Sequence, residues 1–175
     1  LAILDAITTG PQILIGSSMG GWISLLAARE RRERVAAIIG IAAAPDFTER
    51  GIWTKMTEEQ RTRMEEEGEV REPSEYWGEE YIYTKALIED GRKHLLLDDP
   101  IAIHAPVRLL QGLQDDAVPW ETALELLDKL GSEDVQLHLV KDGDHRLSRP
   151  QDLATLLDTL ARLHAHVSDS AMHAA

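Results

Sequence analysis

Hydrophobic and polar positions divide this chain into short apolar runs and longer amphipathic segments. Apolar runs of the kind that form strands buried on both faces of a sheet lie at residues 12–15, 35–44 and 107–111. At Val135–Val140 apolar and polar residues alternate, which predicts a half-exposed strand near a sheet edge. A helical pattern follows the first run directly, and the resulting strand, helix, strand order predicts a parallel sheet with right-handed crossovers. The fold class is therefore α/β.

Two further helices are predicted in the second half of the chain. One covers residues 119–130, with a proline near its start and Gly131 after its end. The other has a leucine stripe and is expected to begin with a capping box formed by Ser148 and Gln151. We expect the tail after His166 to be frayed.

Residues 45–100 interrupt this alternation of strands and helices. Helices are predicted at residues 57–67 and 85–97, and a group of aromatic residues lies between them. We interpret residues 45–100 as a helical cap inserted into a core formed by residues 1–44 and 101–175. The aromatic residues of residues 45–100, which include Trp53 before the first of these helices, either line a substrate pocket or pack the cap onto the sheet. Among them we select Trp53 and Trp77 as candidate substrate-binding residues.

Composition excludes several classes of function. The formal net charge of −13 over 175 residues argues against nucleic-acid binding. The chain contains no cysteine, which excludes disulfides and thiol catalysis. No stretch approaches the roughly 20 apolar residues that a membrane span requires. We therefore expect a protein without a membrane span or a nucleic-acid partner.

The first candidate for chemistry is Ser18, in the segment from Gly16 to Gly20 that matches G-x-S-x-G. This motif forms a sharp turn between a strand and a helix and exposes the serine hydroxyl above the sheet. The adjacent helix N-terminus supplies amide groups that can stabilise an oxyanion, and the amide of Met19 is the first of these. The alternative to a catalytic serine is an ordinary glycine-rich turn between a strand and a helix. Ser17 offers a second hydroxyl, but the spacing of the motif selects Ser18.

A nucleophilic serine needs a base and an acid, which follow it along the chain in the order Asp or Glu, then His. Asp115 and Asp116 follow the predicted strand 107–111, and His145 follows the strand Val135–Val140. The carboxyl ends of parallel strands meet at one edge of the sheet, so these loops should converge on Ser18.

The other histidines lie in less suitable places. Two precede the aspartate loop, one lies inside a strand, and three lie on or beyond the last helix: His94, His104, His138, His164, His166 and His173. Asp142 and Asp144 flank His145, but no second histidine or cysteine is near enough in sequence to indicate a metal site. We expect neither a metal nor another cofactor.

Three segments resemble a known family. They run from Gly10 to Trp22, from Asp115 to Trp120 and from Asp144 to Arg146, and the cap is also similar around Pro73 and Tyr76. They are similar to the mitochondrial acyl-protein thioesterases of the α/β-hydrolase superfamily, described as palmitoyl-protein thioesterases and mycophenolic acid acyl-glucuronide esterases, and to their bacterial relatives. The resemblance implies Ser18 as nucleophile, Asp115 as acid and His145 as base. Counting G-x-x-D-x-x-V-P from Gly112 selects Asp115 over Asp116.

Members of this fold have several strands before the serine turn, and an early loop supplies a second oxyanion amide. This chain begins at Leu1, so we expect it to be the C-terminal part of the fold, without those strands and that amide. The resemblance implies a serine hydrolase that cleaves esters or thioesters of small molecules or acylated proteins through an acyl-enzyme. Alternatives are a carbon–carbon bond hydrolase, a peptidase, or an inactive fragment. We expect a cytoplasmic location, or a mitochondrial one for a eukaryotic member.

Overall fold

The computed structural model describes residues 1–73 and 80–173. The chain divides into two compact units, one formed by Leu1–Pro45 with Leu96–Ala175 and the other by Asp46–Leu95. The elements of the first unit are α1 (Ala2–Ile7), β1 (Gln12–Ser17), α2 (Met19–Glu30), η1 (Arg32–Arg34), β2 (Val35–Ile41), β5 (Val107–Gly112), α5 (Trp120–Lys129), β6 (Val135–Val140) and α6 (Pro150–His173). Those of the second are η2 (Phe47–Ile52), η3 (Trp53–Lys55), α3 (Glu58–Glu67), β3 (Glu69–Pro73), β4 (Glu80–Thr84), α4 (Lys85–Gly91) and η4 (Arg92–His94).

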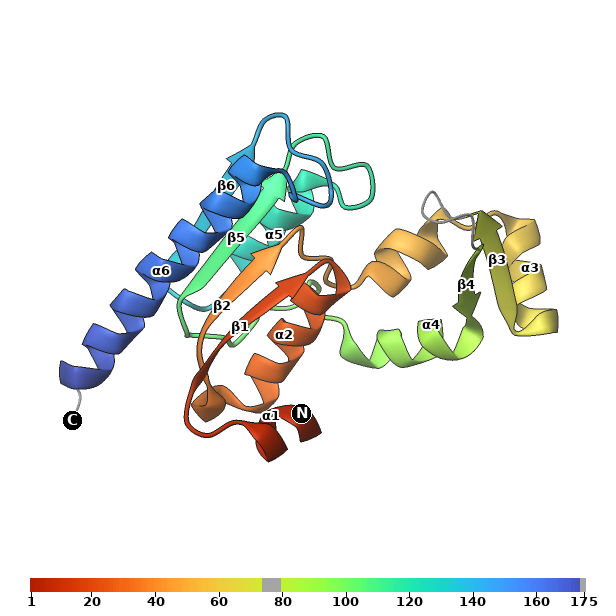
Figure 1. Cartoon of the computed structure of the whole chain (residues 1–175). Helices are drawn as coiled ribbons and strands as arrows, with labels where there is room; N and C mark the ends of the chain where they lie inside the picture. Colours follow the sequence, from red (N-terminus) through yellow and green to blue (C-terminus); the bar gives the residue numbers. More distant parts are fainter. Residues whose placement is uncertain (74–79, 174–175) are drawn as a thin grey trace. The chain divides into compact units, whose positions relative to one another are not determined.

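The first unit contains a four-stranded parallel sheet in the order β1-β2-β5-β6 (Figure 1). Each step along the chain moves in the same direction across this sheet. Right-handed crossovers therefore place α2 and α5 on one face, and α6 packs on the other. The predicted parallel sheet with flanking helices is confirmed, and so is the edge position of Val135–Val140.

The core beneath α6 is built from alternate residues of the two central strands. Ala37 and Ile39 of β2 and Leu110 of β5 pack against Leu147 and Leu163, and none of the five is more than 6% exposed. Side chains alternate between the faces of a sheet, so these residues all face α6. Because their burial holds both strands in place, the loops that leave the carboxyl ends start from fixed positions.

Two boundaries of the first unit differ from the sequence-based expectation. The strand expected at residues 35–44 ends at Ile41, because Ala42 has a positive φ of 45° that turns the backbone out of the sheet. The last helix begins at Pro150, and its cap is formed by the Asp152 carboxylate, which accepts from the backbone amide of Arg149, rather than by the expected Ser148 and Gln151 pair.

The end of α6 also differs. The helix continues to His173 instead of fraying after His166. Val167 packs against the core on the α6 face, so burial of its side chain stabilises the helix beyond the expected end.

The second unit contains a two-stranded antiparallel sheet that the sequence analysis did not predict. Strands β3 and β4 pair over Glu69–Pro73 and Glu80–Thr84. The helix expected at residues 85–97 is shorter, since α4 ends at Gly91 and η4 follows. Helix α3 matches the expected range, and Thr57 and Gln60 form a capping box at its start.

The second unit has a small apolar core of its own. It is formed by side chains from η2, α3, β3, α4 and the segment before α3: Ile52, Met56, Met64, Val70 and Ile88. No helix within residues 1–73 and 80–173 is both long and apolar enough to span a bilayer.

Candidate active site

Ser18 forms the turn between β1 and α2, with φ 54° and ψ −121°. A non-glycine residue in a conformation of this kind costs on the order of 1–3 kcal/mol. Close packing of the backbone makes the turn possible. A Cβ on Gly16 would overlap the carbonyl oxygen of Gly20, and one on Gly21 would lie 2.6 Å from the Cβ of Ala43. The glycines at positions 16 and 21 are therefore required by steric contact.

Backbone hydrogen bonds hold this strained turn in place. The Ser18 amide donates to the carbonyl of Ile41 at 2.9 Å, and the Ser18 carbonyl accepts from Gly21 at 3.0 Å and from Ala44 at 3.1 Å. Met19 is the first residue of α2. Its amide belongs to the first helical turn, where amide groups lack a partner one turn earlier in the helix.

Asp115 lies in the loop between β5 and α5, and its side chain is fully buried. Its Oδ1 accepts from the backbone amides of Ala117 at 3.0 Å and Val118 at 2.8 Å. Its Oδ2 accepts from Nε2 of Gln111 at 2.9 Å. A buried carboxylate with this many donors is held in one orientation.

The loop after β5 is joined to the loop after β6. The Gln114 amide donates to the carbonyl of Gly143, and the Leu113 amide donates to the carbonyl of Val140, each at 2.9 Å. A Cβ on Gly112 would overlap the Gly143 carbonyl oxygen. The two loops therefore form one hydrogen-bonded assembly at the carboxyl ends of neighbouring strands.

Local turns fix the backbone on the C-terminal side of His145. Oδ1 of Asp144 accepts from the amides of Arg146 at 3.1 Å and Leu147 at 2.9 Å. Leu147 has a positive φ of 44° and a side chain that is buried in the core beneath α6. The turn that contains His145 is therefore fixed on its C-terminal side by these hydrogen bonds and by the burial of Leu147.

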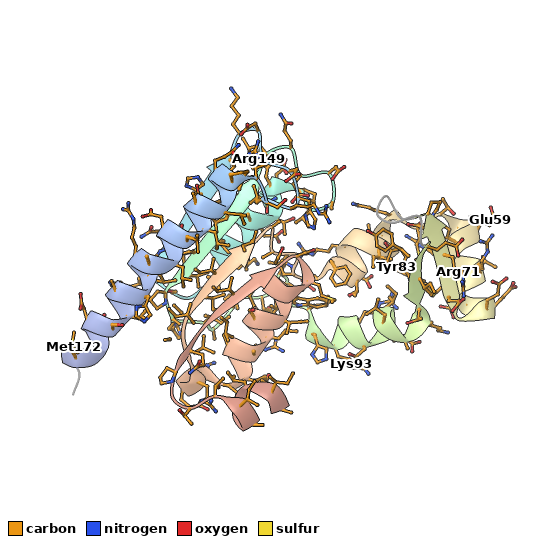
Figure 2. All side chains as sticks on the ribbon, in the orientation of Figure 1. Glu59, Arg71, Tyr83, Lys93, Arg149 and Met172 are labelled. Carbon is orange, nitrogen blue, oxygen red and sulfur yellow. The ribbon has the colours of Figure 1, made fainter. Side chains whose placement is uncertain are left out.

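Arg149, labelled in Figure 2, connects the end of this loop to α6. Its guanidinium donates two hydrogen bonds to the Asp142 carboxylate, at 2.8 and 3.3 Å, and two to the Asp152 carboxylate, at 2.8 and 3.0 Å. Hydrogen bonds from Arg149 hold the pKa of both carboxyls below its ordinary value. One guanidinium thus bridges the two ends of the segment that carries His145.

Three side chains from these distant segments meet at the carboxyl edge of the sheet. Nδ1 of His145 lies 2.9 Å from Oδ2 of Asp115, and Nε2 of His145 lies 3.1 Å from Oγ of Ser18. The donor of each bond depends on the imidazole tautomer. Since a carboxylate only accepts, the neutral ring carries its proton on Nδ1, and Nε2 is left to accept from the serine hydroxyl.

Burial and charge act on both titrating groups. Burial alone would raise the pKa of Asp115, but hydrogen bonds from His145 and the Val118 amide outweigh it and hold the pKa below its ordinary value. The hydrogen bond with Asp115 raises the pKa of His145, burial opposes this, and the carboxylates of Asp115, Asp116 and Asp144 add to the rise. The net result is a His145 pKa above its ordinary value.

The runner-up acid, Asp116, is exposed and affects His145 through its charge. Asp115, by contrast, makes the direct hydrogen bond to the imidazole. Ser17, the neighbouring hydroxyl, lines a separate cavity of about 120 Å³ between the sheet and α6.

The two expected substrate-binding tryptophans belong to other parts of the chain. Trp53 lies in the second unit, where the guanidinium carbons of Arg61 and Arg92 lie 5.3 and 4.7 Å from the centre of its ring. Trp77 lies outside the described residues. Its assignment and that of Trp53 stay predictions.

Sequence reasoning missed Gln111, which contacts the carboxylate of Asp115. The signal was an uncharged polar residue directly after Leu109 and Leu110 at the end of the strand. Within residues 1–73 and 80–173, no group of three or more His, Cys, Asp or Glu side chains is arranged to hold a metal ion.

Comparison with known proteins identifies relatives over nearly the whole chain. Palmitoyl-protein thioesterase ABHD10, mitochondrial, of Mus musculus is 42% identical over 164 residues, which are 91% of this chain and 54% of that protein. The Homo sapiens protein of the same name is 40% identical over 165 residues, 91% of this chain and 52% of that protein. The chain thus spans about half the length of the curated relatives it matches.

Solved structures agree. A protein described as a hydrolase from Agrobacterium vitis S4 has a TM-score of 0.89 and 42% identity over 93% of this chain and 64% of its own. Alpha/beta hydrolase domain-containing protein 10 from mouse has a TM-score of 0.84 and 38% identity, covering 95% of this chain and 66% of its own. These relatives confirm the α/β-hydrolase fold and the resemblance to the acyl-protein thioesterases.

A family model supports the same assignment. The model of the prolyl oligopeptidase family matches residues 7–169, which is most of the chain. The chain therefore belongs to the prolyl oligopeptidase family of α/β hydrolases.

Proposed function

We propose that this chain carries the catalytic triad of a serine hydrolase that cleaves carboxylic esters or thioesters. Ser18 is the nucleophile, His145 the general base and Asp115 the acid that orients it. The observation that carries the proposal is the continuous hydrogen-bonded series from Asp115 Oδ2 through the His145 ring to Ser18 Oγ. A serine hydroxyl is a weak nucleophile until a base removes its proton, and the position of His145 supports that role.

The reaction proceeds in two acyl transfers. Nε2 of His145 takes the proton of Ser18 as Oγ bonds to the substrate carbonyl carbon, and the backbone amide of Met19 donates to the developing oxyanion. The carbon–oxygen or carbon–sulfur bond then breaks, and His145 gives its proton to the leaving alcohol or thiol. A water molecule next loses a proton to His145 and attacks the acyl-serine. The carboxylic acid leaves as Ser18 regains its proton.

The buried carboxylate has two roles in this scheme. Asp115 holds the imidazole proton on Nδ1, so that Nε2 faces the serine. It also stabilises the imidazolium that forms in each step, in agreement with the raised pKa of His145.

For the substrate, we propose a fatty acyl thioester of a protein or small molecule. The support is the printed name of the curated relatives, palmitoyl-protein thioesterase. We further propose that residues 45–100 act as a cap and that Trp53 and Trp77 line the acyl pocket. The curated relatives are named mitochondrial, whereas a cytoplasmic location is our expectation for a bacterial member.

A substrate panel tests this assignment. We expect hydrolysis of acyl thioesters and p-nitrophenyl esters, a preference among acyl chain lengths, and complete loss in Ser18→Ala. A peptidyl p-nitroanilide belongs in the panel, because the matching family is described by its oligopeptidases. Cleavage of the anilide without ester or thioester hydrolysis would replace the proposal by a peptidase.

A further inference from the structure

Gln111 occupies an unusual position for a polar residue. It is the penultimate residue of β5, between β2 and β6, and only 1% of its surface is exposed. The other buried side chains of this strand are apolar: Val107, Leu109 and Leu110. A buried amide in such surroundings needs hydrogen-bond partners.

The partners of Gln111 are concentrated on its nitrogen. Nε2 lies 2.9 Å from Oδ2 of Asp115, 3.2 Å from the carbonyl oxygen of Val118 and 3.3 Å from that of Gly112. Within the described residues, Oε1 is buried and has no hydrogen-bond partner. A 180° turn of the amide would direct Oε1 at a carboxylate and two carbonyls, so the three acceptors determine its orientation.

These contacts join the aspartate loop to the end of the strand. The Val118 amide donates to Oδ1 of Asp115 at 2.8 Å, while the Val118 carbonyl accepts from Gln111. The same Gln111 nitrogen donates to Oδ2 of Asp115. Gln111 therefore holds both the carboxylate and the backbone that follows it.

The oxygen that Gln111 contacts is also the one that faces the histidine. Oδ2 of Asp115 lies 2.9 Å from Nε2 of Gln111 and 2.9 Å from Nδ1 of His145. A shift of this oxygen changes the direction of the His145 ring and the approach of its Nε2 to Ser18. The buried, unpartnered Oε1 lowers stability, which an apolar side chain at this position would avoid. A group that costs stability next to a reactive side chain is typical of a functional position.

We propose that Gln111 is a positioning residue, which holds Oδ2 of Asp115 where it accepts from Nδ1 of His145. The proposal rests on the function proposed above. The hydrogen bonds of Gln111 go to Asp115, Val118 and Gly112, so it acts on His145 through the carboxylate of Asp115.

The first test removes the donor and keeps the shape. Gln111→Met has a side chain of similar length, cannot donate to Asp115, and eliminates the unpartnered oxygen. We expect an unchanged or higher Tm, a KM within about 2-fold of the original, and a kcat about 10- to 100-fold lower, as small misplacements of catalytic groups produce. The control is Gln136→Met on the exposed surface of β6, for which both constants should be unchanged.

The second test uses a donor that pH can switch off. In Gln111→Glu the introduced carboxyl is buried beside Asp115, so its pKa is raised and it is protonated at low pH. In that form its O–H donates to Oδ2 of Asp115. As the pH rises it ionises, and two carboxylates then face each other. We expect the activity of Gln111→Glu, as a fraction of the original enzyme at each pH, to fall with rising pH. The corresponding fraction for Gln111→Met should be independent of pH.

The outcomes separate this proposal from the one on which it rests. A Gln111→Met variant with the original kcat, or equal pH dependence of the two relative activities, would overturn the positioning role and leave the triad untouched. Unfolding of both variants would overturn it too, since Gln111 would then be a requirement of the fold. Activity that persists in Ser18→Ala would instead refute the serine hydrolase proposal.

Discussion

Nδ1 of His145 lies 2.9 Å from Oδ2 of Asp115, although 30 residues separate them in sequence. The side chain of Asp115 is fully buried, and that of His145 is 18% exposed. Two loops that leave neighbouring strands produce this contact, and backbone hydrogen bonds between the loops keep it in place. In the proposed mechanism an ion pair forms between these two side chains, and at such a site it is little screened by water.

Asp115→Asn should keep the fold and lose most of the activity. The amide that replaces the carboxylate can donate to the imidazole, which favours the wrong tautomer, so we expect kcat to fall about 10,000-fold. Steady-state hydrolysis of a p-nitrophenyl ester measures this. The matched control is Asp128→Asn on the exposed surface of α5, which should retain full activity. A fall of less than about 10-fold in Asp115→Asn would contradict the assigned role.

The pH profile should reflect the raised pKa of His145. Only the neutral imidazole accepts the serine proton, so activity falls as the pH drops through this pKa. The acidic limb of the log kcat/KM profile should therefore have its midpoint above about pH 6.5, the ordinary pKa of histidine. Asp116 contributes to the rise through its charge, so Asp116→Asn should move the limb to lower pH and leave the plateau unchanged. An acidic limb that moves to higher pH, or does not move, would show that the charge of Asp116 does not act on His145.

The tight turn at Ser18 can be tested with a pair of glycine variants. In Gly16→Ala the new methyl group would overlap the backbone carbonyl of Gly20, whereas in Gly20→Ala it meets no atom within 4 Å. Overpacking of this kind costs about 1–3 kcal/mol. We expect a lower Tm and loss of activity for Gly16→Ala, and an unchanged Tm for Gly20→Ala. Equal melting temperatures by differential scanning calorimetry would argue against the close approach at position 16.

Arg149 should stabilise the segment that carries His145. Arg149→Met removes four side-chain hydrogen bonds and leaves the Asp152 side chain, which is 3% exposed, without its cation. We expect the urea midpoint to fall because a nearly buried carboxylate loses its partner, and kcat to fall because the histidine is held less firmly. Arg162→Met removes an exposed pair with Asp158 and serves as control, with a change of under about 1 kcal/mol. Urea denaturation that gives the same change for both variants would contradict a bracing role.

The parallel sheet and the order of the site residues were predictable from the sequence because their signals are local. Apolar runs and a glycine-rich turn are visible without knowing what lies across the sheet. The meeting of Ser18, Asp115 and His145 followed from the rule that the carboxyl ends of parallel strands share an edge. Their chemical roles remain proposals.

The features that the sequence did not reveal depend on long-range packing. Val70 is buried in the core of the second unit, yet three of the five residues of its strand are charged, namely Glu69, Arg71 and Glu72, and the strand was not recognised. The end of β2 depends on the left-handed backbone of Ala42, which alanine rarely adopts. The sequence analysis treated Gln111 only as the last residue of a predicted strand. Its contacts with Asp115 and Val118 form only when the loop after β5 folds back over the end of that strand.

Labelling with a fluorophosphonate probe is the most direct test of the central claim, because the probe reacts with a serine only where a base activates it. Peptide mapping of the labelled protein should place the adduct on Ser18, and labelling should disappear in Ser18→Ala and persist in Ser17→Ala. Labelling of Ser18→Ala, or a folded protein that does not react with the probe, would contradict the claim that Ser18, His145 and Asp115 form a working triad.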